Sequence, residues 1–247
     1  MPENSTRLSG PPRDYFATTR WTVVLAAGDR SAPEADIALE ELCRTYWYPL
    51  YAYIRRHGHS KEDAEDLAQS FFARFLQKNY LEKLRSEYGK FRAFLLASLK
   101  HYLANEWDRA RRQKRGGGLP HLSLDWQSAD TRYRIDPPDT LSPDKIYDRA
   151  WAVTLLERVI IRLRDENTAT GDAASFEKLK PFLMTARGEV PYARAAAELE
   201  MTEGAARVAV HRLRRRYREL LREEICQTLS DPAQAEEEMR ALFGAFA

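Results

Sequence analysis

Cysteine is scarce in this 247-residue sequence: only Cys43 and Cys226 occur, and their spacing fits neither a disulfide framework nor a zinc site. We expect both to be buried or half-buried thiols. Long hydrophobic runs are also absent, because no apolar stretch approaches the roughly 20 residues that span a bilayer. The polar, proline-containing N-terminus has no signal-peptide core. We therefore expect a cytoplasmic protein that does not bind membranes.

Patterns typical of catalysis are missing as well. The five histidines form no metal-ligand spacing, and no nucleophile lies in a recognisable elbow. The glycine run 116–118 follows a predicted helix and lacks the Lys-Ser/Thr ending of a phosphate-binding loop, so we interpret it as a helix stop with a flexible link. These absences predict no catalytic residue, no metal site and no cofactor, hence a protein that is not an enzyme.

Helical periodicity dominates what remains. Leu, Ala, Arg and Glu are abundant, and apolar residues recur every three to four positions, which predicts an all-α fold of two small helical domains joined by an extended linker. Helices are predicted around Trp21, after Pro33 with a kink at Pro49, at 91–114 and at 143–164. The expected organisation is a disordered tail at 1–17, a first domain at 18–115, an acidic linker at 116–145, a second domain at 146–230 and an amphipathic extension at 231–247.

Two helices near the C-terminus have the layout of a helix-turn-helix: a short helix at 192–199, a tight connection and a long helix at 203–228. Because the net charge is only +2, nucleic-acid binding must be argued from where the charges cluster. A solvated bundle helix is the alternative, but such a surface would intersperse more acids, so we favour DNA contact. The predicted buried stripe is Ala206, Val210, Leu213, Tyr217, Leu220 and Leu221, and the predicted basic face is Arg207, His211, Arg214, Arg215, Arg218 and Arg222.

The predicted helix at 91–114 carries a second pattern. Side chains that project opposite its core stripe mix bases with apolar groups, which suits single-stranded nucleic acid because bases can stack while phosphates are neutralised. Burial of both faces by neighbouring helices is an equally good interpretation for Trp107, whereas we favour nucleic acid for the basic residues at 109–115. The side chains that share this direction are Leu96, Lys100, Leu103, Trp107 and Arg111.

Acidic residues gather at the start of another predicted helix. Ser60 is expected to cap it, with Asp63 three residues later, and acidic side chains favour the positive end of the helix dipole. Asp63 and Asp66 lie one turn apart and could hold magnesium, but no histidine or distant acid is paired with them. We therefore interpret the patch as a polar docking face, and keep a metal-dependent nuclease using Asp63, Glu65 and Asp66 as an alternative.

Taken in order, three stretches resemble bacterial RNA polymerase sigma factors of the extracytoplasmic-function (ECF) type. DAEDLAQSFF, from Asp63, is similar to the family's signature in conserved region two. FRAFLLASLKHYLANEWDRARRQKR, from Phe91, is similar to the segment that melts and reads the minus-10 element. TEGAARVAVHRLRRRYRELL, from Thr202, is similar to the region-four helix that reads the minus-35 element. The resemblance covers most of 21–228, and its specificity lies in the order of the motifs.

This resemblance implies a transcription initiation factor that binds core RNA polymerase at the β′ clamp and the β flap and directs it to promoter DNA. A regulator such as an anti-sigma factor is a further candidate partner. The main rival is a helix-turn-helix regulator that binds duplex DNA without polymerase. The implied contacts are Asp63, Asp66, Gln69 and Phe72 to polymerase; Arg92, Lys100, His101, Asn105, Trp107, Arg109 and Arg112 to the minus-10 element; and Thr202, Arg207, His211, Arg212 and Arg215 to the minus-35 element.

The sequence departs from the family pattern at three places. Glu200 occupies a turn position where members often have glycine, so we expect a turn strained by about 1 kcal/mol or another turn conformation. The connection between the domains, up to about Tyr192, is longer than the compact pattern. The extension from Asp231 has no counterpart, and we expect it either to contact a regulator or to cover the core.

Overall fold

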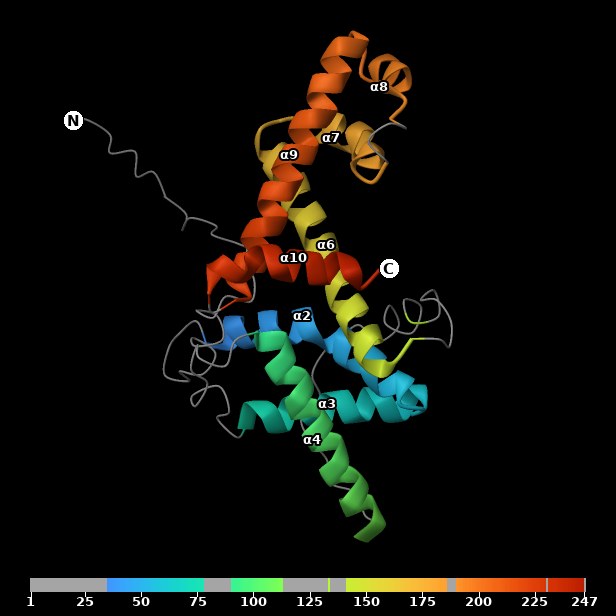
Figure 1. Cartoon of the computed structure of the whole chain (residues 1–247), viewed down its shortest axis with the longest axis vertical. Coiled ribbons are helices and arrows are strands. Elements are labelled where there is room, and N and C mark those ends of the chain that lie inside the picture. The colour runs from blue at the N-terminus through green and yellow to red at the C-terminus, as the bar shows by residue number, and fades with distance from the viewer. Residues whose placement is uncertain are drawn as a thin grey trace, which may run out of the picture.

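The computed structural model of the chain describes residues 35–77, 90–112, 133, 141–185, 190–229 and 231–246 (Figure 1). All regular secondary structure within these ranges is helical, which confirms the predicted all-α fold. The predicted tail, the predicted helix around Trp21 and most of the predicted linker lie outside the described residues.

Three helices form a first body at the lower end of Figure 1: α2 (Ala35–Arg56), α3 (Lys61–Gln77) and α4 (Phe91–Arg112). Pro49 does not interrupt α2. Tyr46 and Tyr51 of α2 are completely buried, and the Tyr46 ring meets the ring of Phe91 edge-on at 5.3 Å between centroids. Burial of each large apolar side chain contributes about 2 kcal/mol, so α2 is the main support of this body.

The start of α3 is fixed by the predicted cap. The backbone N–H of Asp63 donates to Oγ of Ser60 at 3.0 Å, and the Ser60 hydroxyl donates to Oδ2 of Asp63 at 2.9 Å. The first hydrogen bond satisfies an amide that has no partner within the helix. The cap therefore sets the position of the acidic first turn of α3.

Helix α6 (Pro143–Ala169) takes part in both halves of the molecule and, at about 1.5 Å per residue, spans about 40 Å. It packs on α2 and also on α9 (Glu203–Gln227). Near its middle, Arg158 donates to the hydroxyl of Thr45 on α2, and one turn later Arg162 pairs with Glu223 of α9 at 2.6 Å. The helix is longer than the predicted 143–164. It ends at Ala169, and Gly171, two residues later, has a φ of 83° that suits the position just after a helix terminus.

The second body consists of the second half of α6 and the helices that follow it up to α9, and it ends in a helix-turn-helix at the upper end of Figure 1. Helix α7 (Ala173–Leu179) and the 3-10 helix η2 (Lys180–Leu183) lead to α8 (Tyr192–Glu198), which packs on α9. The predicted stripe of α9 is confirmed, because all six of its members are buried.

The turn between α8 and α9 is strained as expected. Among the described non-glycine residues, Glu200 alone has a positive φ, at 54°. The N–H of Met201 donates to the carbonyl of Ala196 at 3.0 Å, and the N–H of Glu200 to that of Ala197 at 3.4 Å. This is the hydrogen-bond pattern of a helix end at which glycine is usual. A left-handed residue with a side chain costs about 1 kcal/mol there.

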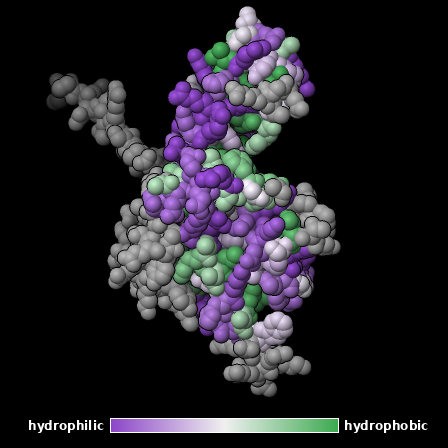
Figure 2. Space-filling model, in the orientation of Figure 1, coloured by the Kyte–Doolittle hydropathy of each residue, from purple (hydrophilic) through white to green (hydrophobic). Residues whose placement is uncertain are grey.

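The C-terminal extension forms η3 (Pro232–Gln234) and α10 (Ala235–Gly244), which crosses the molecule between the two bodies (Figure 1). Ala235, Glu238 and Leu242 are buried, whereas Phe243 is 53% exposed. Helix α10 contacts α6 and α9. Figure 2 shows apolar residues gathered at this level, below a largely hydrophilic upper body. The extension therefore covers part of the core, which was one of its two expected roles.

Both cysteines are free thiols, with Cys43 buried and Cys226 half-buried, as predicted. Burial, and to a smaller degree the charge of Glu40, raises the pKa of Cys43 to about 12, so this thiol stays protonated and unreactive. In the part of the chain that the structure describes, no helix is both long and apolar enough to cross a membrane.

Candidate nucleic-acid and polymerase interfaces

Helix α4 is buried on one side and open on the other. Its buried side consists of Phe91, Leu95, Leu99 and Tyr102. Trp107 is 70% exposed, so the interpretation in which both faces of the helix are buried is wrong for this residue. The open side presents four of the side chains implied in minus-10 contact: Lys100, His101, Asn105 and Trp107.

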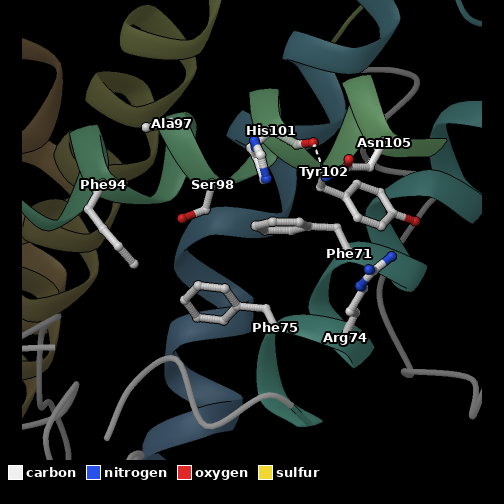
Figure 3. Close-up of a pocket in the computed structure, with 9 residues that line it drawn as sticks. All are labelled: Phe71, Arg74, Phe75, Phe94, Ala97, Ser98, His101, Tyr102 and Asn105. Carbon is white, nitrogen blue, oxygen red and sulfur yellow. Dashed lines mark hydrogen bonds between the residues drawn. The ribbon is translucent and has the colours of Figure 1, made fainter. Parts of the chain in front are cut away.

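A pocket of about 320 Å³ lies between α3 and α4 on one flank of this open side (Figure 3). Phe71 and Phe75 of α3 contribute aromatic walls, with the two rings tilted by 34° and their centroids 5.5 Å apart. His101 and Asn105 of α4 lie on the other side, where the Asn105 amide donates to the His101 carbonyl at 2.9 Å. We call this the aromatic pocket. Apolar rings beside hydrogen-bonding groups suit a planar base.

Arg74 lines the aromatic pocket and was not among the predicted site residues. Its guanidinium lies 5.9 Å from the centroid of the Tyr102 ring and pairs with Glu106 at 3.1 Å. Arg74 lies three to four residues after Ser70 and Phe71, so it shares a side of α3 with them. Projecting the helix that begins at the acidic motif could therefore have indicated that Arg74 faces α4. It supplies a cation at the edge of the pocket.

A second hollow, of about 670 Å³, lies on the opposite flank of α4. Lys100, Leu103 and Trp107 of α4 line it together with Leu67 of α3 and with His57, which follows the end of α2. We call it the tryptophan groove. The Lys100 ammonium pairs with Asp144 of α6 at 2.7 Å, and this hydrogen bond raises the pKa of the lysine. Lys100 is therefore charged at the rim of an apolar groove.

Arg92 lies apart from both hollows. Its side chain is 15% exposed, and its guanidinium pairs with Asp148 of α6 and, at 2.5 Å, with Glu238 of α10. It also stacks over the ring of Trp151 at 4.9 Å. In this structure Arg92 joins three helices and is not presented to solvent. The side chains of Arg109 and Arg112 lie outside the described residues, although their backbone belongs to α4.

The residues implied in polymerase docking divide into two groups on α3. Asp63 and Asp66 are exposed and Gln69 is half-buried, so their polar groups can reach a partner. Phe72 is only 2% exposed, and its ring packs edge-on against Phe71. Phe72 therefore supports the helix from within the core.

On α9, the exposed side bears the residues implied in minus-35 contact. Thr202 caps the helix by accepting the N–H of Ala205 at 3.2 Å. Arg207 lies 4.9 Å from the Tyr192 ring and pairs with Glu203 at 3.3 Å. The residues of this face that are exposed to solvent are Arg207, His211, Arg212, Arg215, Arg218 and Arg222.

Arg214 differs from the sequence interpretation, which placed it on the basic face. Its guanidinium donates to the carbonyls of Phe182 and Thr185, so it fastens the end of η2 to α9. Val208 was missed. It is 50% exposed between Arg207 and His211 and gives the basic face an apolar element. A lone valine beside arginines carries no signal that the sequence alone could resolve.

Within the described residues, no group of three or more His, Cys, Asp or Glu side chains could hold a metal ion. Asp63 is engaged with Ser60 as a helix cap. The acidic first turn of α3 is therefore explained by its capping and its contribution at the helix dipole.

Residues 42–113 match the protein family described as Sigma-70 region 2. No curated protein and no solved structure matches the chain. The matched residues include α3, almost all of α4 and the part of α2 that carries the core tyrosines, and so they hold the aromatic pocket and the tryptophan groove. Nothing in this family points to catalysis. The first body is thus a sigma-70 region 2 domain, which supports a sigma factor with a role in RNA polymerase binding and promoter recognition.

Proposed function

We propose that the protein is an ECF-type sigma factor that directs core RNA polymerase to specific promoters by helping to melt the minus-10 element and by reading the minus-35 duplex. One observation carries this proposal: the region 2 match falls on the helix whose open side has a pocket on each flank, and a basic helix-turn-helix lies at the far end of the same molecule (Figure 1). A protein with this function would act in the bacterial cytoplasm.

Helix α4 would hold the opened minus-10 strand. Unstacked bases lose their neighbours when a duplex opens, and aromatic surfaces replace part of that stacking at about 1–3 kcal/mol per base. Trp107 offers such a surface beside the tryptophan groove, and the aromatic pocket offers a second one with His101 and Asn105 as hydrogen-bonding groups. Lys100, Arg109 and Arg112 are proposed to neutralise the phosphates.

Helix α9 would enter the major groove of the minus-35 duplex. In helix-turn-helix proteins, the N-terminal residues of the second helix meet the base edges, and arginine is the usual reader of guanine. Arg207, His211 and Arg212 lie in the first three turns of α9 and are exposed. Arg215 lies one turn further and is suited to the phosphate backbone. Val208 can meet the methyl group of a thymine.

Helix α3 would dock on the β′ clamp through Asp63, Asp66 and Gln69, with Phe72 supporting the helix from below. Exposed carboxylates attract a basic partner surface and speed association. The second body is proposed to contact the β flap. An anti-sigma factor or other regulator is a further proposed partner.

The main rival is a helix-turn-helix regulator that acts without polymerase. This rival explains the basic face of α9, but it does not explain why residues 42–113 match sigma-70 region 2. A nuclease that uses Asp63, Glu65 and Asp66 has even less support, because no group of three or more His, Cys, Asp or Glu side chains among the described residues could hold a metal ion.

The proposal is tested by titrating fluorescently labelled chain with bacterial core RNA polymerase. We expect saturable binding that Asp66→Arg weakens at least about tenfold, because like charges would then face each other across the interface. Asp165→Arg is the matched control: it makes the same charge change at an exposed site on α6 and should leave binding unchanged. Absence of core binding, with duplex DNA binding retained, would contradict the proposal in favour of the rival.

A further inference from the structure

The two bodies are held together at several separate places. At the N-terminal end of α6, Arg56 of α2 donates to the Leu141 carbonyl at 2.8 Å. Immediately beyond, the first half of α6 buries Tyr147 and Trp151 completely or nearly so. These contacts fix α6 on the region 2 domain along its first turns.

The other half of α6 is fixed on α9 in a similar way. Arg162 pairs with Glu223 at 2.6 Å and with the buried Glu224 at 3.2 Å. One turn later, Glu166 accepts two hydrogen bonds from Arg216, at 2.7 and 2.8 Å. A single uninterrupted helix therefore forms part of both bodies, and neither can turn about it without breaking paired charges.

Helix α10 adds a further set of contacts where the two bodies meet. Glu238 is completely buried, and its carboxylate contacts Arg92 in the first turn of α4 at 2.5 Å and the ammonium of Lys90, immediately before α4, at 2.7 Å. On the other side, Glu236 lies 3.5 Å from Arg222 of α9. We call Lys90, Arg92 and Glu238 the waist contact. It ties the last helix of the chain to the helix proposed to hold the minus-10 strand.

We propose that α6 and the waist contact hold the helix-turn-helix and α4 at a fixed separation and angle, so that Glu238 helps to set the length of promoter spacer that the protein accepts. This inference rests on the proposed function. It assigns a specificity role to residues that touch no DNA.

Because of the geometry of the duplex, a fixed arrangement of the two bodies would distinguish promoter spacers that differ by a single base pair. Each added base pair moves the two promoter elements apart by about 3.4 Å and rotates one about the other by about 35°. An extended linker between independent domains absorbs both changes at little cost. Helices packed and ion-paired on each other do not, because packed interfaces switch between discrete arrangements and do not deform continuously.

The test uses the full chain with core polymerase on one promoter, selected with the wild-type protein, whose spacer is varied over five consecutive lengths. Glu238→Gln removes the buried charge at nearly constant volume. Leu242→Ala loosens α10 through its apolar side, in case the first variant folds poorly. Arg240→Gln is the control, since Arg240 is exposed on the same helix and bonds the Glu236 carbonyl within it. The readout is the ratio of run-off transcripts across spacer lengths.

We expect the wild-type chain and Arg240→Gln to lose about tenfold or more of the transcript for each base pair away from the best spacer, and both α10 variants to lose less than about threefold. An equally steep profile in both α10 variants, or a flat profile in the wild-type chain, would overturn the inference while leaving the proposed function intact. Absence of any wild-type transcript would instead contradict the proposed function, and the inference with it.

A second measurement needs no polymerase. Spin labels attached after Glu62→Cys on α3 and Lys178→Cys on α7, both exposed positions, in a Cys226→Ser background report the distance between the bodies. A fixed arrangement of the two bodies predicts one narrow distance distribution in the wild-type chain and a broader one after Glu238→Gln. A distribution that is already broad, or one that the substitution leaves unchanged, contradicts the inference.

Discussion

Glu238 and Arg92 lie 146 residues apart in the sequence, and yet Oε1 of the glutamate accepts a hydrogen bond from Nε of the arginine at 2.5 Å. Burial disfavours the charged form of Glu238, but the hydrogen bonds and charges of Arg92 and Lys90 outweigh it and hold the pKa of the carboxyl below its ordinary value. The C-terminal helix is therefore fastened to the region 2 domain by a buried ion pair.

The first prediction concerns the strength of this ion pair. Glu238→Ala should lower the free energy of unfolding by about 3 kcal/mol, because removing one partner leaves a largely buried charge undercompensated. The value is set at the low end of the usual range because Arg92 keeps Asp148 as a partner. Urea denaturation followed by circular dichroism measures it. Glu237→Ala, at an exposed neighbour, should cost less than about 0.5 kcal/mol. Equal effects of the two substitutions would refute a buried ion pair.

The second prediction is a pH dependence of α10. The pKa of Glu238 is lowered in the folded chain, so its contribution to stability is fully present above the ordinary glutamate value near 4.5 and is lost as pH falls through the lowered value. Burial raises the pKa of Asp148, which acts in the opposite direction on overall stability. Amide hydrogen exchange resolved along the chain should therefore show α10 losing protection as the pH falls below 4.5, before α2 does. Simultaneous loss in both helices would contradict this order.

The third prediction concerns the turn of the helix-turn-helix. Glu200→Gly should raise the free energy of unfolding by about 0.5–1 kcal/mol, since glycine adopts the observed φ of 54° without the strain that a side chain causes. Ala197→Gly, three residues earlier and still within α8, should lower it by up to a similar amount, because glycine has a lower helix propensity than alanine. Thermal or urea unfolding provides both values. Destabilisation by Glu200→Gly would mean that the Glu200 side chain makes a contact whose stabilising free energy exceeds the cost of the left-handed backbone.

The fourth prediction separates two neighbouring arginines of α9. Arg215→Ala should weaken binding to different minus-35 sequences to a similar degree and reduce the salt dependence by about one released ion, with little change in stability. Arg214→Ala should lower stability instead, because its guanidinium satisfies two backbone carbonyls. Fluorescence anisotropy at several salt concentrations and urea denaturation distinguish the two. The reverse assignment would mean that Arg214, and not Arg215, faces DNA.

Periodicity predicted most of the described helices, because burial on one side imposes a three-to-four spacing that survives in the sequence. The buried stripe of α9 and the Ser60 cap of α3 are examples in which each residue does what its local pattern indicates. Left-handed strain at Glu200 was also foreseeable, because the position lacks the glycine that the turn favours.

Long-range pairing was not foreseeable. Nothing near Arg92 in the sequence distinguishes it from Lys100. In the structure, Arg92 is largely buried between Glu238 and Asp148, whereas Lys100 is exposed at the rim of the tryptophan groove, where it pairs with Asp144. For the same reason, the sequence did not indicate that α6 packs in both bodies. Its apolar period shows which side is buried, but the identity of the partner helix depends on tertiary packing.

Run-off transcription by bacterial core RNA polymerase on a library of genomic fragments, with and without this protein, tests the sigma-factor function most directly. The proposal predicts discrete new transcription starts that require the protein, that share two sequence elements upstream, and that Trp107→Ala diminishes. Transcription that remains unchanged on adding a protein that still binds duplex DNA would contradict it.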